Sequence, residues 1–142
     1  MFAKQLTVFM ENREGRLSEA LKTLGENNVN ILSLSLADTT EFGLLRLIVD
    51  NPTAGKQALS QNGFSCHASD VCIIKVPHKA GSLNSLLSLV EKQGVNVEYM
   101  YAVSVLGNEA YIVIKASDMQ KLEEILKQIN YETVDVATLT AI

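Results

Sequence analysis

The 142-residue sequence is poor in the residue types that several functional classes require. Its only cysteines are Cys66 and Cys72, with no Cys-x-x-Cys pair, and its two histidines lack the spacing of a metal site. An iron–sulfur ferredoxin needs four cysteines per cluster, so that class is excluded. Heavy-metal chaperones rely on paired cysteines and are disfavoured. We therefore expect buried, reduced thiols, with no metal and no cofactor.

Positive charge and long apolar runs are also scarce. Twelve basic residues against sixteen acidic ones give a formal net charge of −4, and no run of Lys or Arg is present. Nucleic-acid binding usually needs a basic face, so nucleic acid is not an expected partner. No apolar run approaches the ~20 residues that span a bilayer. Residues 1–15 turn polar too early for a signal peptide. The sequence predicts a cytoplasmic, water-soluble protein that does not associate with membranes.

Signs of catalysis are missing as well. The sequence contains no nucleophile elbow and no Gly-rich phosphate loop. Ser104, His78 and the acidic residues occur in no pattern typical of a catalytic set. We therefore do not expect an enzyme.

The sequence does contain an internal repeat. Residues 12–31 (NREGRLSEALKTLGENNVNI) return as residues 78–97 (HKAGSLNSLLSLVEKQGVNV), which aligns Gly15 with Gly81 and Asn30 with Asn96. Each copy has a polar loop with a glycine, an amphipathic helix and an apolar-Asn-apolar step into a strand. A repeat of this kind predicts two similar structural units. We place them at residues 1–69 and 70–142.

Both halves follow one order of predicted elements. In the first half, strands are predicted at 5–10, 29–38, 42–49 and 64–69, with helices beginning at Leu17 and Pro52. In the second half, strands are predicted at 71–76, 95–106, 110–115 and 131–136, with helices at 83–93 and 118–128, the latter capped by Ser117. Each half is thus an α+β, ferredoxin-like βαββαβ unit whose helices cover one face of the sheet. The two sheets are expected to lie side by side.

The repeated loop resembles the ACT domain family. That family's pattern is Asp-x-Pro-Gly-x-Leu, followed after the helix by an apolar-Asn-apolar step. Residues 12–17 read Asn-Arg-Glu-Gly-Arg-Leu and residues 78–83 read His-Lys-Ala-Gly-Ser-Leu, so both copies keep the glycine and leucine but lack the acid and the proline. The resemblance covers the whole chain. It implies a tandem of regulatory modules that bind a free amino acid at the interface between two ACT units.

The resemblance also implies where the ligand binds. Family members use this loop together with the start of the second strand, so residues 12–17 would meet Asn96 and Val97, and residues 78–83 would meet Asn30 and Ile31. A helix N-terminus attracts a carboxylate, and an asparagine amide offers both a donor and an acceptor. The implied ligand-binding residues are Asn12, Arg13, Glu14, Gly15, Arg16, Leu17, Asn30, Ile31, His78, Lys79, Ala80, Gly81, Ser82, Leu83, Asn96 and Val97.

Two further expectations concern partners. Leu44, Ile48, Ile112 and Ile114 belong to strands that are apolar on both faces. Because helices cover only one face, we expect a homodimer. The predicted function is non-catalytic, allosteric regulation of a separate target enzyme. Two alternatives stay open: a structural dimerisation or interaction module without ligand, and a small enzyme on a ferredoxin-like fold. The altered loops also leave open whether one site, both or neither binds.

Overall fold

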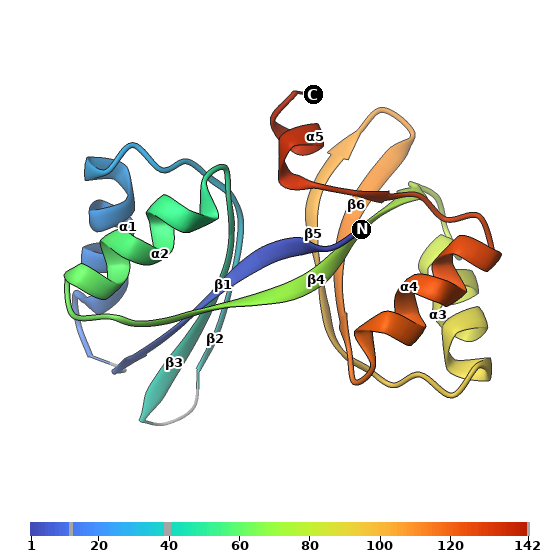
Figure 1. Cartoon of the computed structure of the whole chain (residues 1–142), viewed down its shortest axis with the longest axis horizontal. Coiled ribbons are helices and arrows are strands. Elements are labelled where there is room, and N and C mark those ends of the chain that lie inside the picture. The colour runs from blue at the N-terminus through green and yellow to red at the C-terminus, as the bar shows by residue number, and fades with distance from the viewer. Residues whose placement is uncertain (12, 39–40, 142) are drawn as a thin grey trace. The chain divides into compact units, whose positions relative to one another are not determined.

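The computed structural model describes residues 1–11, 13–38 and 41–141, which form two compact units (Figure 1). The N-terminal unit comprises Lys4–Ser69. The C-terminal unit comprises Asp70–Ile142 together with Met1–Ala3. The elements in chain order are β1 (Ala3–Glu11), α1 (Arg16–Glu26), β2 (Ile31–Asp38), β3 (Phe42–Val49), α2 (Pro52–Gln61), β4 (Ser65–Pro77), α3 (Ser82–Lys92), β5 (Val97–Leu106), β6 (Glu109–Ala116), α4 (Met119–Gln128), β7 (Thr133–Val134) and α5 (Val136–Thr140).

The N-terminal unit is an antiparallel sheet with two helices on one face (Figure 1). Its strands follow the order β2-β3-β1-β4, and the register places Leu6 opposite Leu47 and Val8 opposite Leu45. These side chains are fully buried beneath α1 and α2, where Leu24 and Leu59 complete the core. The register is strongly specified because a slip of one residue would move all of them to the opposite face.

The C-terminal unit repeats this plan. Its strands follow the order β7-β4-β6-β5, and Cys72 lies opposite Ile114 and Ile74 opposite Ile112. The helices α3 and α4 cover one face of the sheet, and their Leu86 and Leu122 are fully buried in the core (Figure 1). The predicted α+β fold, with two ferredoxin-like βαββαβ repeats, is thereby confirmed.

Three predicted element boundaries were wrong. The strands expected at 64–69 and 71–76 are one continuous strand, β4. The strand expected at 131–136 is only Thr133–Val134, after which the chain forms α5. The reason is Asp135, whose carboxylate accepts hydrogen bonds of 2.8 Å from both the backbone N–H and the hydroxyl of Thr138. These bonds lower the pKa of Asp135. The cap of α4 is Asp118 rather than Ser117.

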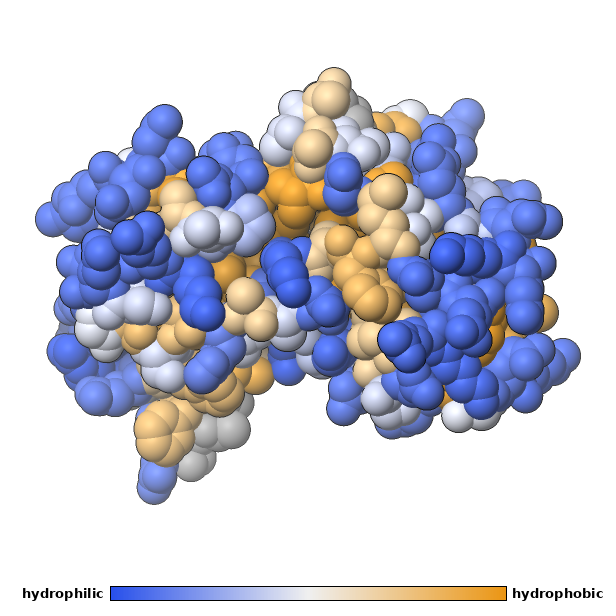
Figure 2. All heavy atoms as spheres, viewed as in Figure 1, coloured by the Kyte–Doolittle hydropathy of each residue, from blue (hydrophilic) through white to orange (hydrophobic). Residues whose placement is uncertain are grey.

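Three of the four residues that suggested a homodimer are already covered within the chain, and the fourth, Leu44, is half-buried. Ile112 and Ile114 are packed into the core of the C-terminal unit, and Ile48 is fully buried. The large apolar side chains that are exposed lie elsewhere: Met1, Phe9, Leu34, Leu36, Phe42, Leu83, Leu89, Val105 and Leu106. On the face seen in Figure 2, hydrophilic residues dominate over α1, α2 and α4.

The helices begin in two different ways. Asn51, Asp118 and Asp135 cap α2, α4 and α5 with side-chain hydrogen bonds. In contrast, α1 and α3 start at Gly15 and Gly81, which have left-handed φ angles of 86° and 87° and provide no side-chain cap. No helix in the described part of the chain combines the length and apolarity needed to cross a membrane.

We predict that Asp118→Ala lowers the free energy of unfolding by about 1 kcal/mol, because it removes a side-chain N-cap. The Asp118 carboxylate accepts a hydrogen bond of 3.0 Å from the backbone N–H of Lys121. Urea denaturation measures the change. Asp118→Asn should preserve stability, as should Ser117→Ala at the neighbouring position. Equal losses from Asp118→Ala and Ser117→Ala would contradict this assignment.

Candidate functional site

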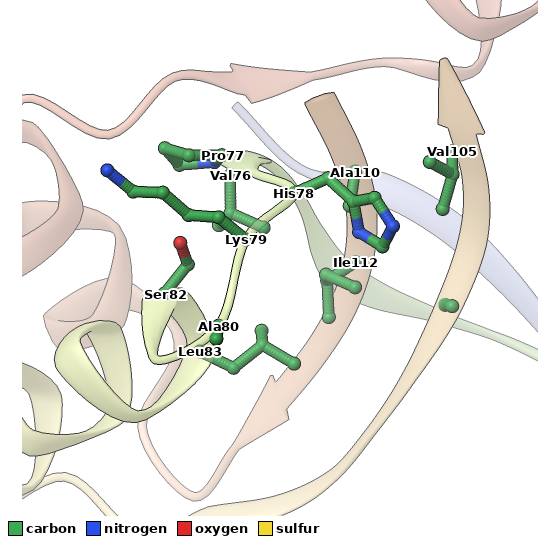
Figure 3. A pocket seen from close by; sticks show the side chains of 11 residues that line it. Val76, Pro77, His78, Lys79, Ala80, Ser82, Leu83, Val105, Ala110 and Ile112 are labelled. Atoms are coloured by element: carbon green, nitrogen blue, oxygen red, sulfur yellow. The ribbon is translucent and has the colours of Figure 1, made fainter. Parts of the chain in front are cut away.

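A cavity of about 490 Å³ lies beside the start of α3 in the C-terminal unit (Figure 3). The end of β4, the following loop and the first residues of α3 form one wall, and β5 and β6 form the other. Its lining residues are Val76, Pro77, His78, Lys79, Ala80, Ser82, Leu83, Ala102, Val105, Ala110 and Ile112. Five of the six residues in the predicted loop 78–83, all except Gly81, therefore line one concave surface.

Ser82 is the polar residue of α3 among those that line this cavity. Ser82 is the first residue of α3 and is only 8% exposed. Its Oγ is buried and has no hydrogen-bond partner in the described structure. Buried polar atoms are nearly always hydrogen-bonded, and leaving one unpaired costs roughly 1–3 kcal/mol. The backbone N–H of Ser82 donates to the Lys79 carbonyl at 3.2 Å, which fixes the residue at the helix start.

Apolar side chains make up most of the remaining cavity wall. Leu83, from the start of α3, and Ile112, from β6, point toward one another across it (Figure 3). His78 and Lys79 are exposed at its rim. The His78 backbone is held in place because its N–H donates to the Asn108 carbonyl at 2.7 Å. The cavity thus combines an apolar interior with a helix N-terminus, where partial positive charge favours an anion.

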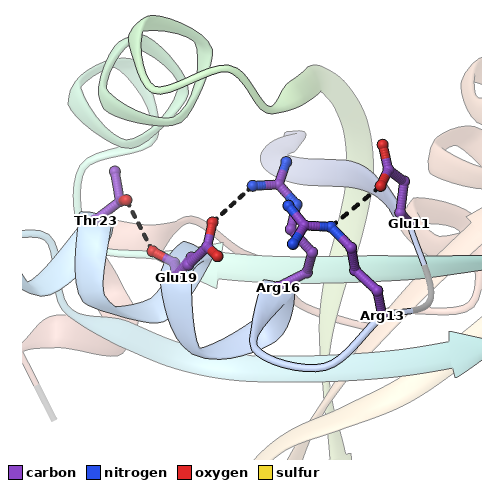
Figure 4. Close-up of polar contacts among 5 residues, drawn as sticks. All are labelled: Glu11, Arg13, Arg16, Glu19 and Thr23. Atoms are coloured by element: carbon purple, nitrogen blue, oxygen red, sulfur yellow. Dashed lines mark hydrogen bonds and ion pairs between the residues drawn. The ribbon is translucent and has the colours of Figure 1, made fainter.

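The matching loop of the N-terminal unit is more crowded. Arg13 pairs with Glu11 at 3.2 Å, and Arg16 Nη1 pairs with Glu19 Oε2 at 2.8 Å (Figure 4). The Arg16 guanidinium also lies 4.0 Å from the centre of the Phe64 ring. Glu14 is exposed, and Leu17 packs against the core. Asn12 lies outside the described residues. Two cavities lie beside this loop: one of about 260 Å³ that extends toward Phe42 and Ser65, and one of about 90 Å³ lined by Arg13, Leu17 and Leu36.

The predicted asparagines lie at the other ends of the helices. The Asn30 backbone N–H donates to Asp50 Oδ1 at 2.9 Å, and the Asn96 carbonyl accepts from the Ser117 N–H at 3.0 Å. Ile31 and Val97 follow them and are half-buried against the cores of their own units. None of these four is among the described residues that line the cavity of its own unit. The pairing of each loop with an asparagine of the other repeat stays a prediction.

The cysteines are both free and buried. Burial raises the pKa of the Cys66 thiol and raises the pKa of Cys72 to about 11. Within the described ranges, no three His, Cys, Asp or Glu side chains converge in an arrangement that could hold a metal ion.

Comparison with known proteins decides the family. A family model described as "ACT domain pair" matches residues 1–142. The chain belongs to the ACT domain pair family. The structure of protein BT0572 from Bacteroides thetaiotaomicron superposes with a TM-score of 0.89 at 38% identity, covering 94% of this chain and 92% of that one.

More distant structures share the fold of this ACT domain pair. The ligand-free regulatory subunit of aspartate kinase from Thermus thermophilus gives a TM-score of 0.63 at 13% identity, covering 88% of this chain and 91% of that one. The corresponding subunit from Thermus flavus gives 0.61 at 11% identity, covering 88% and 90%. No protein with a curated description of its function matches the chain. The resemblance to ACT domains is thus confirmed.

Sequence reasoning missed part of the cavity wall. Val76 and Pro77 end β4, while Ala102, Val105, Ala110 and Ile112 come from the β5–β6 hairpin. The pairing of β6 with β4 brings the hairpin residues next to the loop, because it places Ala110 opposite Val76. No pattern in the hairpin sequence marks these residues as part of a cavity wall.

We predict that both thiols react slowly with iodoacetamide in the folded protein, even at mildly alkaline pH. The thiolate is the reactive form, and a raised pKa keeps it rare. For Cys72, with a pKa of about 11, the thiolate becomes abundant only near that pH. Mass spectrometry should show rapid modification of both cysteines in concentrated guanidinium chloride. Equally fast modification of the native protein would show that the thiols are accessible.

Proposed function

We propose that this ACT domain pair is a non-catalytic regulatory module that binds a free amino acid and acts on a separate enzyme. The observation that carries the proposal is the cavity at the start of α3, whose lining residues include Ser82 with its buried and unpartnered hydroxyl. The fold shared with the regulatory subunit of aspartate kinase supports a regulatory role.

The chemistry of the site suits a carboxylate. The helix α3 has 11 residues and begins at Gly81 without a side-chain cap. Its first backbone N–H groups and the positive end of its dipole therefore favour an anionic group. The Ser82 hydroxyl would donate a hydrogen bond to the ligand carboxylate, which gives that buried group the partner it lacks. The ligand's ammonium group would stay hydrated at the mouth of the cavity.

A thermal-shift screen of the free amino acids at millimolar concentration tests this function. A ligand that binds only the folded state raises the melting temperature by mass action. We expect at least one amino acid to stabilise the protein in a concentration-dependent manner. If the protein is folded and no amino acid shifts the melting temperature, the module does not bind amino acids. The alternative of a structural module without ligand would then be supported.

Ser82→Ala separates binding from stability. We predict that the ligand found in the screen binds about tenfold more weakly, because one hydrogen bond to its carboxylate is lost. The unliganded variant should be as stable as the wild type or more stable, because it loses a buried hydroxyl that has no partner. Calorimetric titration and urea denaturation measure the two effects. Ser85→Ala, one turn along α3, is the matched control, since the Ser85 hydroxyl is exposed and donates to the Gly81 carbonyl.

We also propose that the chain forms a homodimer through the edge of β2. This strand ends the order of the N-terminal sheet, and Leu34 on it is 46% exposed. A paired edge would cover such a side chain, whereas lone edges usually carry charges.

Analytical ultracentrifugation tests the dimer and its location. The wild type should sediment as a dimer at micromolar concentration, and Leu34→Lys should sediment as a folded monomer. Lysine at an edge strand disfavours pairing without removing core contacts. Leu89→Lys is a control, because Leu89 is a similarly exposed leucine on α3. A wild-type monomer would overturn the proposal.

A further inference from the structure

The cavities beside α1 and α3 occupy the same place in the two repeats. The small cavity is lined by Met10, Glu11, Arg13, Arg16, Leu17, Leu36 and Gly43. In the repeat alignment, the first six correspond to residues that line the large cavity: Val76, Pro77, Lys79, Ser82, Leu83 and Ala102. Gly43 corresponds to Ala110, because they lie opposite Met10 and Val76 in equivalent strand pairs. The fold therefore builds one kind of cavity twice.

The two copies differ greatly in volume, at about 490 Å³ beside α3 and about 90 Å³ beside α1. One cause is Leu36, which stands where the second repeat has Ala102. A Cβ placed on Gly43 would lie 3.7 Å from Leu36 Cδ1, so the leucine side chain lies against β3 at Gly43, and both residues line the small cavity. The smaller Ala102 leaves this space open between β5 and the start of α3.

The second cause is Arg16, which stands where the second repeat has Ser82. Its side chain is 15% exposed and lines the small cavity. The guanidinium is fixed by the Phe64 ring at 4.0 Å and by Glu19 at 2.8 Å. Among the described residues, two buried side-chain polar atoms have no hydrogen-bond partner, and these are Arg16 Nε and Ser82 Oγ. At the same helix position, the first repeat has a long side chain that occupies part of the cavity, and the second repeat has a short one that leaves more space.

We infer that each chain binds one ligand, in the cavity beside α3, and that this ligand is an amino acid with an aliphatic side chain. The equivalent place beside α1 is narrowed to about 90 Å³, with Arg16 and Leu36 among its lining residues. This inference rests on the proposed amino-acid function and names its site, its stoichiometry and its ligand class. Val76, Leu83, Val105 and Ile112 give the side chain an apolar surface to bury. Each buried CH₂ contributes about 0.8 kcal/mol, whereas a charged side chain would lose hydration there.

Isothermal titration calorimetry of the full chain tests the inference with L-leucine, L-isoleucine and L-valine, against L-aspartate and L-lysine. At least one aliphatic amino acid should bind with one site per chain and more than tenfold tighter than the charged pair. Two sites per chain would overturn the single-site inference. Tighter binding of L-aspartate or L-lysine would overturn the ligand class but leave the amino-acid function standing. Binding of none of the twenty amino acids would overturn the function itself.

Exchanging residues between the repeats tests the location. Ala102→Leu and Ser82→Arg, which copy the first repeat, should each weaken binding of the aliphatic amino acid more than tenfold. The matched double variant Arg16→Ser with Leu36→Ala should retain at least the wild-type affinity. Loss of binding in the double variant, with binding retained in Ala102→Leu, would place the ligand beside α1 and overturn the inference.

Methyl NMR of the wild type keeps the location testable if a variant fails to fold. The ligand should shift the methyl signals of Leu83, Val105 and Ile112 and leave those of Leu17 and Leu36 unchanged. The opposite pattern would contradict the assigned site.

Discussion

Both units depend on one backbone turn, in which the chain leaves a central strand and enters a helix through a left-handed glycine. Gly15 and Gly81 have almost identical φ angles of 86° and 87°. A residue with a Cβ pays about 1–2 kcal/mol for that conformation. The turn places each helix across its sheet, where Leu24 and Leu86 become fully buried. It also leaves both helices without a side-chain cap, so the geometry that packs the core presents an uncapped helix end beside a cavity.

The sequence predicted this turn because its chemistry is local. The spacing of Gly15 and Gly81, the leucines that follow and the asparagines at the helix ends are all visible along the chain. Asn28, just after α1, is left-handed with a φ of 58°, and Gly107-Asn108 connects β5 to β6. The opposite wall of the cavity was not predicted, because Ala102 and Val105 become neighbours of α3 only through strand pairing. The sequence pattern of β5 is the same whether its residues line a cavity or face solvent on an ordinary strand.

Errors in the predicted elements arose where one polar residue overrode an apolar pattern. The run from Tyr131 to Val136 has the composition of a strand. Asp135 interrupts it, because its carboxylate accepts two hydrogen bonds from Thr138 and so starts a helix. At Ser69-Asp70 the opposite occurred, since two polar residues suggested a break but β4 continues through them.

The difference between the repeats follows from where substitutions are tolerated. Core positions are surrounded by packed side chains, so equivalent positions of the two repeats both carry aliphatic residues. Val8 corresponds to Ile74, and Leu45 corresponds to Ile112. The first residue of the helix is less constrained, because its side chain borders a cavity rather than the close-packed core. Arginine there binds an aromatic ring and a carboxylate of its own unit. Serine there is too short for either contact and keeps a buried hydroxyl unpaired. A duplicated fold can thus narrow one cavity and keep the other without altering the packing that holds both units together.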